Sequence, residues 1–294
     1  MADKIKKIAL TTVLLLLART MVGDVPLYEP KVGDEYRITR TYETSSESSG
    51  GSSGSSSGSN AIVERIIGVR AEGLEIEYDL PDTVSEADRA RTWQFPARVY
   101  RPKSGPMQLL NAPELEARIE VWLQAGGMTR EACGKWIFTW NAFLVECDPE
   151  SVIATLSSFD LRVVDLSDGA LYEDAAAEGP GTIAKKATAA NHETYAVTLK
   201  IDPDVVRSDR AENDVVVGEI LNEPVTLEKA LTTRAKEDVS GTIFVTLKAD
   251  SLGNVWHRTR VIEVETTLTN GEQESEKSIE TVERVPITSS TVTK

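Results

Sequence analysis

Apolar and polar residues alternate with a period of two in the early chain. In "GLEIEYDLP" every second residue is apolar and the residues between are acidic, which is typical of a strand with one face in water. The segment "AIVERIIGV" also alternates, and we assign its apolar face to Ala61, Val63, Ile67 and Val69, with Arg65 as an exception. Only the stretch "RAEG" separates the two segments, which predicts a β-hairpin.

A tract of serine and glycine, "SSESSGGSSGSSSGS", follows an earlier strand-like segment and occupies residues 45–59. The segment before it, "EYRITRTYE", places Tyr36, Ile38 and Tyr42 on one face, with Arg40 interrupting it. Residues 21–44 are too few to bury a core of their own, so the tract cannot separate two domains. We therefore predict that it is a disordered loop joining two neighbouring strands of a hairpin.

Helical patterns appear in the middle of the chain. In "APELEARIEVWLQAGG" the apolar residues recur at helical spacing and two glycines end the pattern. In "CDPESVIATLSSF", Asp148 is the expected N-cap and Pro149 the expected first helical residue. These two segments define a mixed insert over residues 112–160.

Strand patterns return after residue 193. "TYAVTLKID" alternates, Asp202 and Pro203 can start a helix, and "TLEKALTTRAKE" predicts another helix. The stretch "DVVVGEIL" between them suits either a strand or a buried helix. The segments "TIFVTLKAD", "VWHRTRVIEVETTLT" and "SEKSIETVERV" predict a three-stranded meander. In its middle strand, Arg258 and Arg260 interrupt an otherwise apolar face.

These patterns predict an α+β fold that is mostly antiparallel β, with curved meander sheets packed against a few helices and a small helix and hairpin insert in the middle. Whether its two halves form one domain or two is left open. The expected divisions are a signal peptide at 1–20, an N-terminal half at 21–160, a connecting segment at 161–193, a C-terminal half at 194–288 and a disordered tail at 289–294.

The N-terminus has the layout of a secretory signal. Lys4, Lys6 and Lys7 precede an apolar run over residues 8–18, and that run is shorter than the about 20 residues needed to span a membrane. We expect export to the periplasm or the medium after removal of the signal, with no stable membrane insertion of the mature chain. The alternative is a buried N-terminal helix or an uncleaved anchor.

The charge of the chain bears on its partners. It has 294 residues, with 32 Lys and Arg against 47 Asp and Glu, for a formal charge of −15. A surface of that sign repels phosphate backbones, so we expect no nucleic-acid partner.

Two cysteines, Cys133 and Cys147, enclose the sequence "GKWIFTWNAFLVE". A hairpin turning near Trp140 and Asn141 would place them opposite each other, which favours a disulfide in an oxidising compartment. Two free cysteines in a core are the alternative.

Aromatic residues gather in the same insert, and they are the candidate ligand-binding residues. They could line an apolar groove, or they could form the core of the insert. The residues are Trp122, Trp136, Phe138, Trp140 and Phe143.

No catalytic or metal-binding pattern is convincing. The Ser/Gly tract matches G-x-S-x-G, but that motif requires a strained turn between a strand and a helix. His192 and His257 are isolated in sequence, and the glutamates near the C-terminus fit an exposed strand face. We expect no catalytic residue, no metal and no cofactor.

The sequence favours a non-enzymatic exported protein that binds an apolar or envelope-derived ligand or a partner protein. Two alternatives stay open. One is a structural or assembly protein of the cell envelope without a small-molecule pocket, and the other is a hydrolase that uses carboxylates or a histidine.

Overall fold

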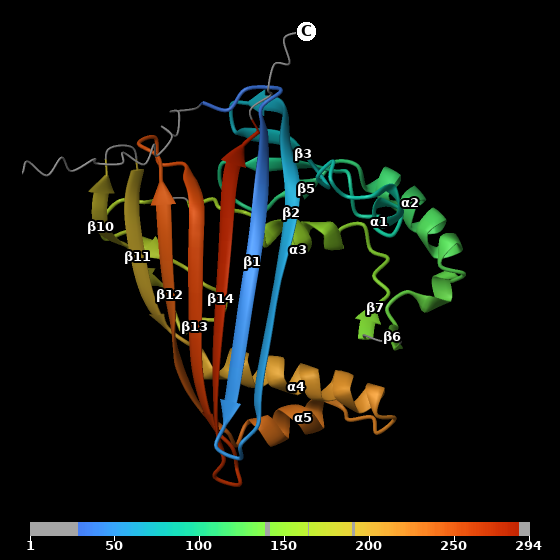
Figure 1. Cartoon of the computed structure of the whole chain (residues 1–294), viewed down its shortest axis with the longest axis vertical. Coiled ribbons are helices and arrows are strands. Elements are labelled where there is room, and N and C mark those ends of the chain that lie inside the picture. The colour runs from blue at the N-terminus through green and yellow to red at the C-terminus, as the bar shows by residue number, and fades with distance from the viewer. Residues whose placement is uncertain (1–28, 139–141, 164, 190–191, 288–294) are drawn as a thin grey trace, which may run out of the picture.

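One ten-stranded antiparallel sheet dominates the computed structural model (Figure 1), which describes residues 29–138, 142–163, 165–189 and 192–287. The fold is mostly antiparallel β, with one large sheet and a few helices. In spatial order the strands are β10 (Ala184–Ala189), β11 (His192–Lys200), β12 (Asp238–Ala249), β13 (Val255–Thr267), β14 (Gln273–Pro286), β1 (Glu35–Ser48), β2 (Ser53–Arg70), β3 (Gly73–Asp79), β4 (Ala97–Pro102) and β5 (Gln108–Leu109).

The first and last long strands of the chain are neighbours at the centre of this sheet. β1 pairs with β14 from Tyr36↔Pro286 to Ser48↔Glu274, and with β2 on its other side. Strands on both sides of the connecting segment therefore belong to one sheet (Figure 1). The predicted hairpin β2–β3 and the predicted meander β12–β13–β14 are both confirmed.

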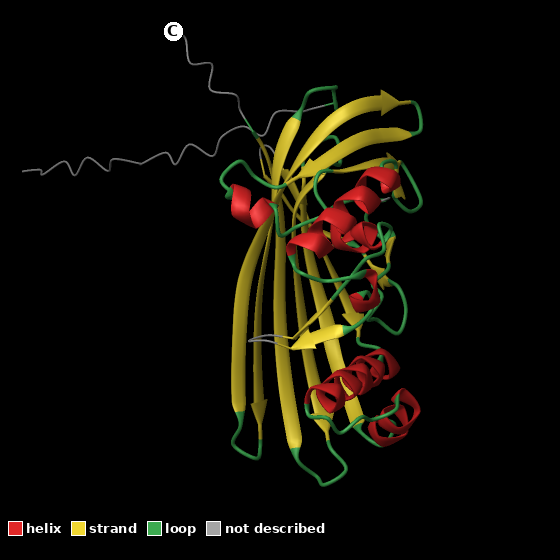
Figure 2. Cartoon of the chain, turned by 90° about the vertical axis from the view of Figure 1, so that its right-hand side faces the viewer, coloured by secondary structure: helices red, strands yellow, loops and turns green. Residues whose placement is uncertain are grey.

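Helices and two small hairpins complete the fold. Viewed from the side, α4 and α5 lie on one side of the sheet at its lower end (Figure 2). The helices are α1 (Glu86–Arg89), α2 (Ala112–Ala125), α3 (Ser151–Ser157), α4 (Pro203–Ile220) and α5 (Leu227–Arg234), with a 3₁₀ turn η1 (Arg130–Ala132). The hairpins are β6 (Trp136–Phe138) with β7 (Ala142–Leu144), and β8 (Leu171–Tyr172) with β9 (Gly181–Thr182).

The ambiguous stretch "DVVVGEIL" is helical and belongs to α4. The Asp202 carboxylate accepts a hydrogen bond from the Asp204 backbone N–H, and Pro203 occupies the first turn, so the helix start outweighs the β-branched run. α3 begins at Ser151, later than predicted, while Asp148 accepts a hydrogen bond from the Glu150 N–H just before it. None of the helices in the described part of the chain combines the length and the apolar character needed to cross a membrane.

The core lies on one face of the sheet, which we call the covered face. Its side chains pack against the buried residues of α2 and α3. The covered face carries, from across the sheet, Ile38, Ile62, Ile76, Val99, Val197, Val245, Leu247 and Val282. α2 contributes Leu115, Ile119 and Leu123, and α3 contributes Val152 and Leu156.

The face that we assigned to β2 from its sequence is wrong. The buried residues are Ile62, Glu64 and Ile66, whereas Ala61 and Val63 are only half-buried. Alternation in this segment is nearly symmetric, because apolar residues occupy both phases. A register shift between Ile66 and Gly68 further obscures the phase in the sequence.

Residues 45–59 are not the disordered loop that we predicted. They form the ends of β1 and β2, which pair as far as Glu47↔Ser53, and only residues 49–52 turn the chain. Gly51 adopts a φ of 90° in that turn, a conformation that glycine adopts without strain. β14 pairs with β1 from Tyr36 to Ser48, so the serine-rich part of β1 has a hydrogen-bonded neighbour on the side away from β2.

Cross-strand contacts stabilise the serine- and glycine-rich ends of β1 and β2, whose small side chains bury little apolar surface. The Tyr42 ring lies over Gly58, so closely that a Cβ at Gly58 would overlap the ring. Thr44 Oγ1 and Ser56 Oγ lie 3.1 Å apart in a hydrogen bond. Such pairs are the units that stabilise a sheet, and glycine opposite an aromatic residue is one of them.

The arginines that interrupt the apolar faces form ion pairs on the covered face. Glu280 Oε2 lies 2.6 Å from Arg40 Nε, and Glu280 Oε1 lies 3.2 Å from an Arg258 nitrogen. Arg260 Nε lies 2.7 Å from an oxygen of Asp174. The interruptions predicted at these three arginines are therefore confirmed, and each has a carboxylate that offsets the cost of burial.

We expect Gly241→Ala to destabilise the sheet. A Cβ at Gly241 would overlap the Glu263 carbonyl oxygen on β13 and lie 3.1 Å from Val264 Cα, and backbone cannot move away without breaking the ladder. The free energy of unfolding, measured with urea, should fall by about 1–3 kcal/mol. Gly179→Ala is the control, since its Cβ would meet nothing within 4 Å, and it should change stability by less than about 0.5 kcal/mol.

Candidate functional site

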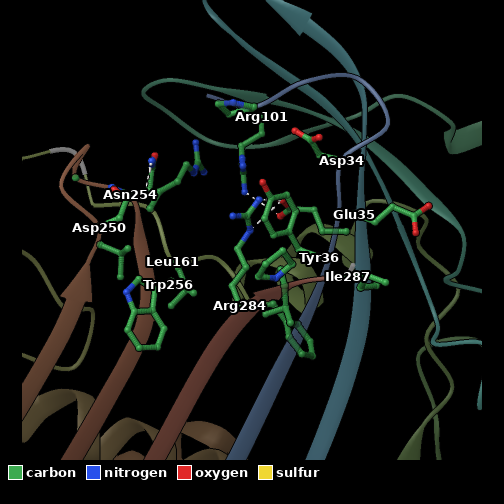
Figure 3. A pocket seen from close by; sticks show the side chains of 18 of the residues that line it. Asp34, Glu35, Tyr36, Arg101, Leu161, Asp250, Asn254, Trp256, Arg284 and Ile287 are labelled. Carbon is green, nitrogen blue, oxygen red and sulfur yellow. Dashed lines mark hydrogen bonds and ion pairs between the residues drawn. The ribbon is translucent and has the colours of Figure 1, made fainter. Parts of the chain in front are cut away.

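A pocket of about 620 Å³ lies between the β12–β13 turn, the start of β1, and the segment that follows α3 (Figure 3). Five strands (β1, β2, β4, β13 and β14) and three loops supply its walls. Its lining includes Asp34, Glu35, Tyr36, Ile38, Glu64, Arg101, Phe159, Leu161, Arg162, Asp250, Trp256, Arg284 and Ile287.

One wall of the pocket is apolar. Ile38, Phe159 and Leu161 are buried members of the main core, so this wall is the continuation of the covered face. Ile287 follows the end of β14 and is 40% exposed. Its backbone N–H donates to the Glu35 carbonyl at 2.8 Å, which fixes the position of this wall beside β1.

The other wall carries a buried carboxylate between two arginines. Glu64 is 0% exposed. Arg284 Nη2 lies 2.6 Å from Glu64 Oε1, and Arg101 Nη1 lies 3.2 Å from Glu64 Oε2. Figure 3 shows Arg101 and Arg284 extending toward each other from opposite sides of the pocket. We call Glu64, Arg101 and Arg284 the charged cluster.

Strand register builds this cluster. Glu64 on β2 pairs with Tyr36 on β1 and with Tyr78 on β3. The Tyr78 hydroxyl donates to Glu64 Oε2 at 3.1 Å, and the Arg284 guanidinium stacks 3.3 Å above the centre of the Tyr36 ring. Side chains from β1, β2, β3, β4 and β14 therefore meet at one position of the sheet.

The environment sets the protonation of the cluster. Burial would raise the pKa of Glu64, but the charges of Arg101 and Arg284 and the hydrogen bonds from Arg284 and Tyr78 outweigh it, so its pKa is lowered. Burial, reinforced by the Glu64 charge, raises the pKa of Tyr78. Glu64 is therefore ionised at neutral pH. Tyr78 stays protonated, and its hydroxyl donates a hydrogen bond to the Glu64 carboxylate.

A third arginine extends the polar wall. Arg162 Nε lies 2.7 Å from Asp160 Oδ2, and Arg162 Nη1 donates to the Pro102 carbonyl at 2.7 Å. Arg101 Nη1 also lies 4.0 Å from Asp160 Oδ1. Three arginines therefore share two carboxylates, Glu64 and Asp160, along this wall, while Asp34, Glu35 and Asp250 line other parts of the pocket.

The two histidines flank Trp256 at the side of the pocket. The ring centres of His192 and His257 lie 6.2 and 5.6 Å from that of Trp256. Burial lowers the pKa of His257, and the positive charge of Lys248 lowers it further. His257 Nε2 lies 3.1 Å from Thr259 Oγ1, and Glu283, opposite His257 on β14, acts on its ring electrostatically.

The predicted disulfide is confirmed. Cys133 and Cys147 are bonded, with their Cα atoms 5.6 Å apart, and β6 and β7 form the hairpin between them. Trp140 and Asn141 lie outside the described residues.

The aromatic ligand site stays a prediction. Trp136 and Phe138 lie on β6 and Phe143 on β7, where it is 41% exposed. Trp122 lies on α2, and its Nε1 donates to the Arg91 carbonyl at 3.0 Å. The 620 Å³ pocket is lined by neither Trp122, Trp136 nor Phe143.

Three glutamates of the last strands, Glu263, Glu274 and Glu280, form ion pairs. Glu263 pairs with Lys277 at 2.8 Å, and Glu274 pairs with Arg210 at 2.7 Å. Within the described ranges, no three His, Cys, Asp or Glu side chains converge in a way that could hold a metal ion.

Sequence reasoning missed the charged cluster. Its residues lie on β2, β4 and β14, so nothing local in the sequence joins them. The sequence does contain one indication of the cluster, because Glu64 lies in the same alternating set of β2 positions as Ile62 and Ile66. We had assigned the other set of positions to the buried face, so Glu64 was expected to face solvent.

We expect Glu64→Gln to cost about 3–5 kcal/mol of unfolding free energy, because it removes the buried negative charge that Arg101 and Arg284, only 13% and 18% exposed, share. The lowered pKa of Glu64 means that its contribution is complete above its unfolded pKa and is lost as pH falls through the folded pKa. The deficit of the variant should therefore be full near neutral pH and shrink in acid. Urea unfolding at several pH values measures it.

Glu43→Gln on the exposed part of β1 is the matched control and should change stability little. A deficit for Glu64→Gln as small as that of the control, or one that grows in acid, would contradict the assignment.

Comparisons with known proteins give no family for this chain, since neither a family model nor a curated protein matches it. Among solved structures it is similar to lipovitellin, studied for its lipid–protein interactions, with a TM-score of 0.43 and 10% identity over 90% of this chain. The chain spans 26% of that lipovitellin chain.

Two further likenesses each cover 87% of this chain and 100% of the other. One is to Ail, the attachment invasion locus protein of Yersinia pestis, with a TM-score of 0.19 and 4% identity. The other is to a loop-deletion mutant of OmpT, an outer membrane protein of Vibrio cholerae, with a TM-score of 0.21 and 7% identity. All three TM-scores are too low for these likenesses to carry an argument about function.

Proposed function

We propose that this is a non-enzymatic, exported binding protein that holds an amphipathic ligand in the 620 Å³ pocket. The observation that carries the proposal is the pairing of an apolar wall with the charged cluster inside one cavity. Small-molecule sites have volumes of about 300–1,000 Å³ and are mostly apolar, with a few placed polar groups.

The charged cluster selects the polar end of the ligand. Arginine side chains offer only hydrogen-bond donors, and their planar geometry matches carboxylate and phosphate oxygens. Arg101, Arg162 and Arg284 supply such donors along one wall of the pocket, where their carboxylate partners are Glu64 and Asp160. The ligand class is therefore an amphiphile with a carboxylate or phosphate head, whose apolar part lies against Ile38, Phe159 and Leu161.

Two features support export. The N-terminal residues have the order of charge and apolar run typical of a secretory signal. The disulfide between Cys133 and Cys147 is of the kind that persists in oxidising compartments such as the periplasm. The proposed location is therefore the periplasm or the extracellular medium, with an envelope amphiphile as the ligand.

Laurate should bind to the wild-type protein, and Ile287→Trp should weaken its binding at least about tenfold by filling the pocket. Isothermal titration calorimetry measures the affinity. Ile220→Trp on α4 is the matched control, because Ile220 and Ile287 are 43% and 40% exposed and only Ile287 lines the pocket.

Dodecylamine separately tests the sign of the charge on the head group of the ligand. We expect it to bind much more weakly than laurate, because arginines repel an ammonium group. Equal affinity for the two compounds would contradict the assigned head group. Equal affinity of laurate for the two tryptophan variants would contradict the pocket.

Export predicts a shortened chain. The intact mass of the protein purified from its own cells should correspond to loss of about the first 20 residues. A full-length mass in the cytosolic fraction would overturn the proposed location while leaving the pocket proposal to the titrations.

A further inference from the structure

β2 has an open edge along its serine-rich part. β3 pairs with β2 only through residues 63–70, whereas β1 pairs with β2 as far as Ser53. Residues 53–62 of β2 therefore have a neighbour on one side only, over a length of about 33 Å. We call this stretch the β2 edge.

Strand alternation identifies the unpaired backbone groups. The N–H and C=O of Ile66 bond with Asp34 and Gly33, on the β1 side. Backbone groups of successive residues alternate in direction, so the even-numbered residues of β2 face β1 and the odd-numbered ones face outward. The outward residues of the β2 edge are Ser53, Ser55, Ser57, Ser59 and Ala61.

The other two edges of the sheet are protected against pairing, and the β2 edge is not. β10 carries Lys185 and Lys186 and a register shift between Lys185 and Ala187. β5 is only two residues long. Lysines, bulges and short strands are the usual means by which proteins block an edge, and residues 53–62 contain no lysine, no proline and no bulge.

The β2 edge is also exposed and free of bulky side chains. Residues 53–57 are all exposed, and every residue from 53 to 60 is serine, glycine or asparagine. The Tyr42 ring lies over Gly58 on the neighbouring strand. A strand added at this edge would find backbone groups without steric obstruction and one aromatic surface close by.

We propose that the β2 edge binds an extended segment of another protein as an additional antiparallel strand. Backbone hydrogen bonds supply the affinity in such complexes, and the side chains of the added strand supply specificity. This inference is independent of the ligand pocket, which lies at the other end of β2.

Charge identifies the chemistry of the partner segment. Residues 41–64 contain three glutamates and no lysine, arginine or histidine. Glu64 is held by Arg101 and Arg284, but Glu43 and Glu47 form no ion pair with any residue that the structure describes. The fitting partner is therefore a strand of uncharged residues flanked by lysine or arginine.

A second copy of this chain fits less well. It would bring a further charge of −15 and another pair of unpaired glutamates to the same place. Like charges across an interface are unfavourable, so the basic segment is the occupant that we infer.

The test uses a labelled peptide with a central Thr-Val repeat and two lysines at each end, measured by fluorescence anisotropy with the full-length protein. We expect saturable binding that weakens with salt. Ser57→Pro should weaken it at least about tenfold, because proline removes an outward N–H and leaves the β1 ladder intact. Ser57→Ala is the control and should bind like the wild type, and an unchanged circular dichroism spectrum and urea midpoint show that both variants are folded.

Four results would contradict the proposal. Equal peptide affinity of Ser57→Pro and the wild type would exclude the β2 edge as the site, and absence of binding would exclude the partner class. A concentration-dependent dimer in analytical ultracentrifugation that Ser57→Pro abolishes would make the occupant a second copy.

A peptide with glutamates in place of the lysines should bind at least about tenfold more weakly at low salt. Equal binding of the two peptides would exclude a partner chosen by its basic residues.

Discussion

The pairing of β1 with β14 is the constraint on which the rest of the structure depends. It joins the two halves of the chain into one sheet, with Tyr36 opposite Pro286 and Ser48 opposite Glu274. The site exists only because of this junction. Glu64, Tyr36 and Arg101 come from strands before residue 103, whereas Trp256 and Arg284 come from strands after residue 254. Without the pairing, neither half would hold a complete pocket, and Glu64 would lack one of its two arginines.

Charge burial follows from the same geometry. Long strands that cross a wide sheet bring positions from distant segments into one row, and several of these positions carry arginine or glutamate. Glu280 between Arg40 and Arg258, and Glu64 between Arg101 and Arg284, each link strands from both halves. Buried ion pairs give little net stability, but an unmatched register would leave charges without partners at high cost. These ion pairs therefore favour the observed strand register over registers shifted by one or two residues.

Local pattern was sufficient for most of the strands and helices, because each depends on a period or a cap that neighbouring residues encode. The meander β12–β13–β14, the helices α2 and α5, and the disulfide could be predicted in this way. Three features could not. The Ser/Gly tract forms the ends of β1 and β2 because β14 pairs with β1 and Tyr42 packs over Gly58. Which face of β2 is buried depends on the strands that it pairs with. The charged cluster joins residues up to 220 positions apart, a relation that no window of sequence contains.

The positions of the cluster also govern the order in which the fold can be completed during synthesis. A ribosome makes Glu64 and Arg101 long before Arg284, which lies on β14, the last of the described strands in sequence. Until that last strand emerges, Glu64 has only one of its arginines and β1 has only one neighbour, so the early half keeps its central charge hydrated and its sheet unfinished. Closing of the core therefore waits for the synthesis of β14, and a product that ends before β14 lacks the arginine that completes the charged cluster.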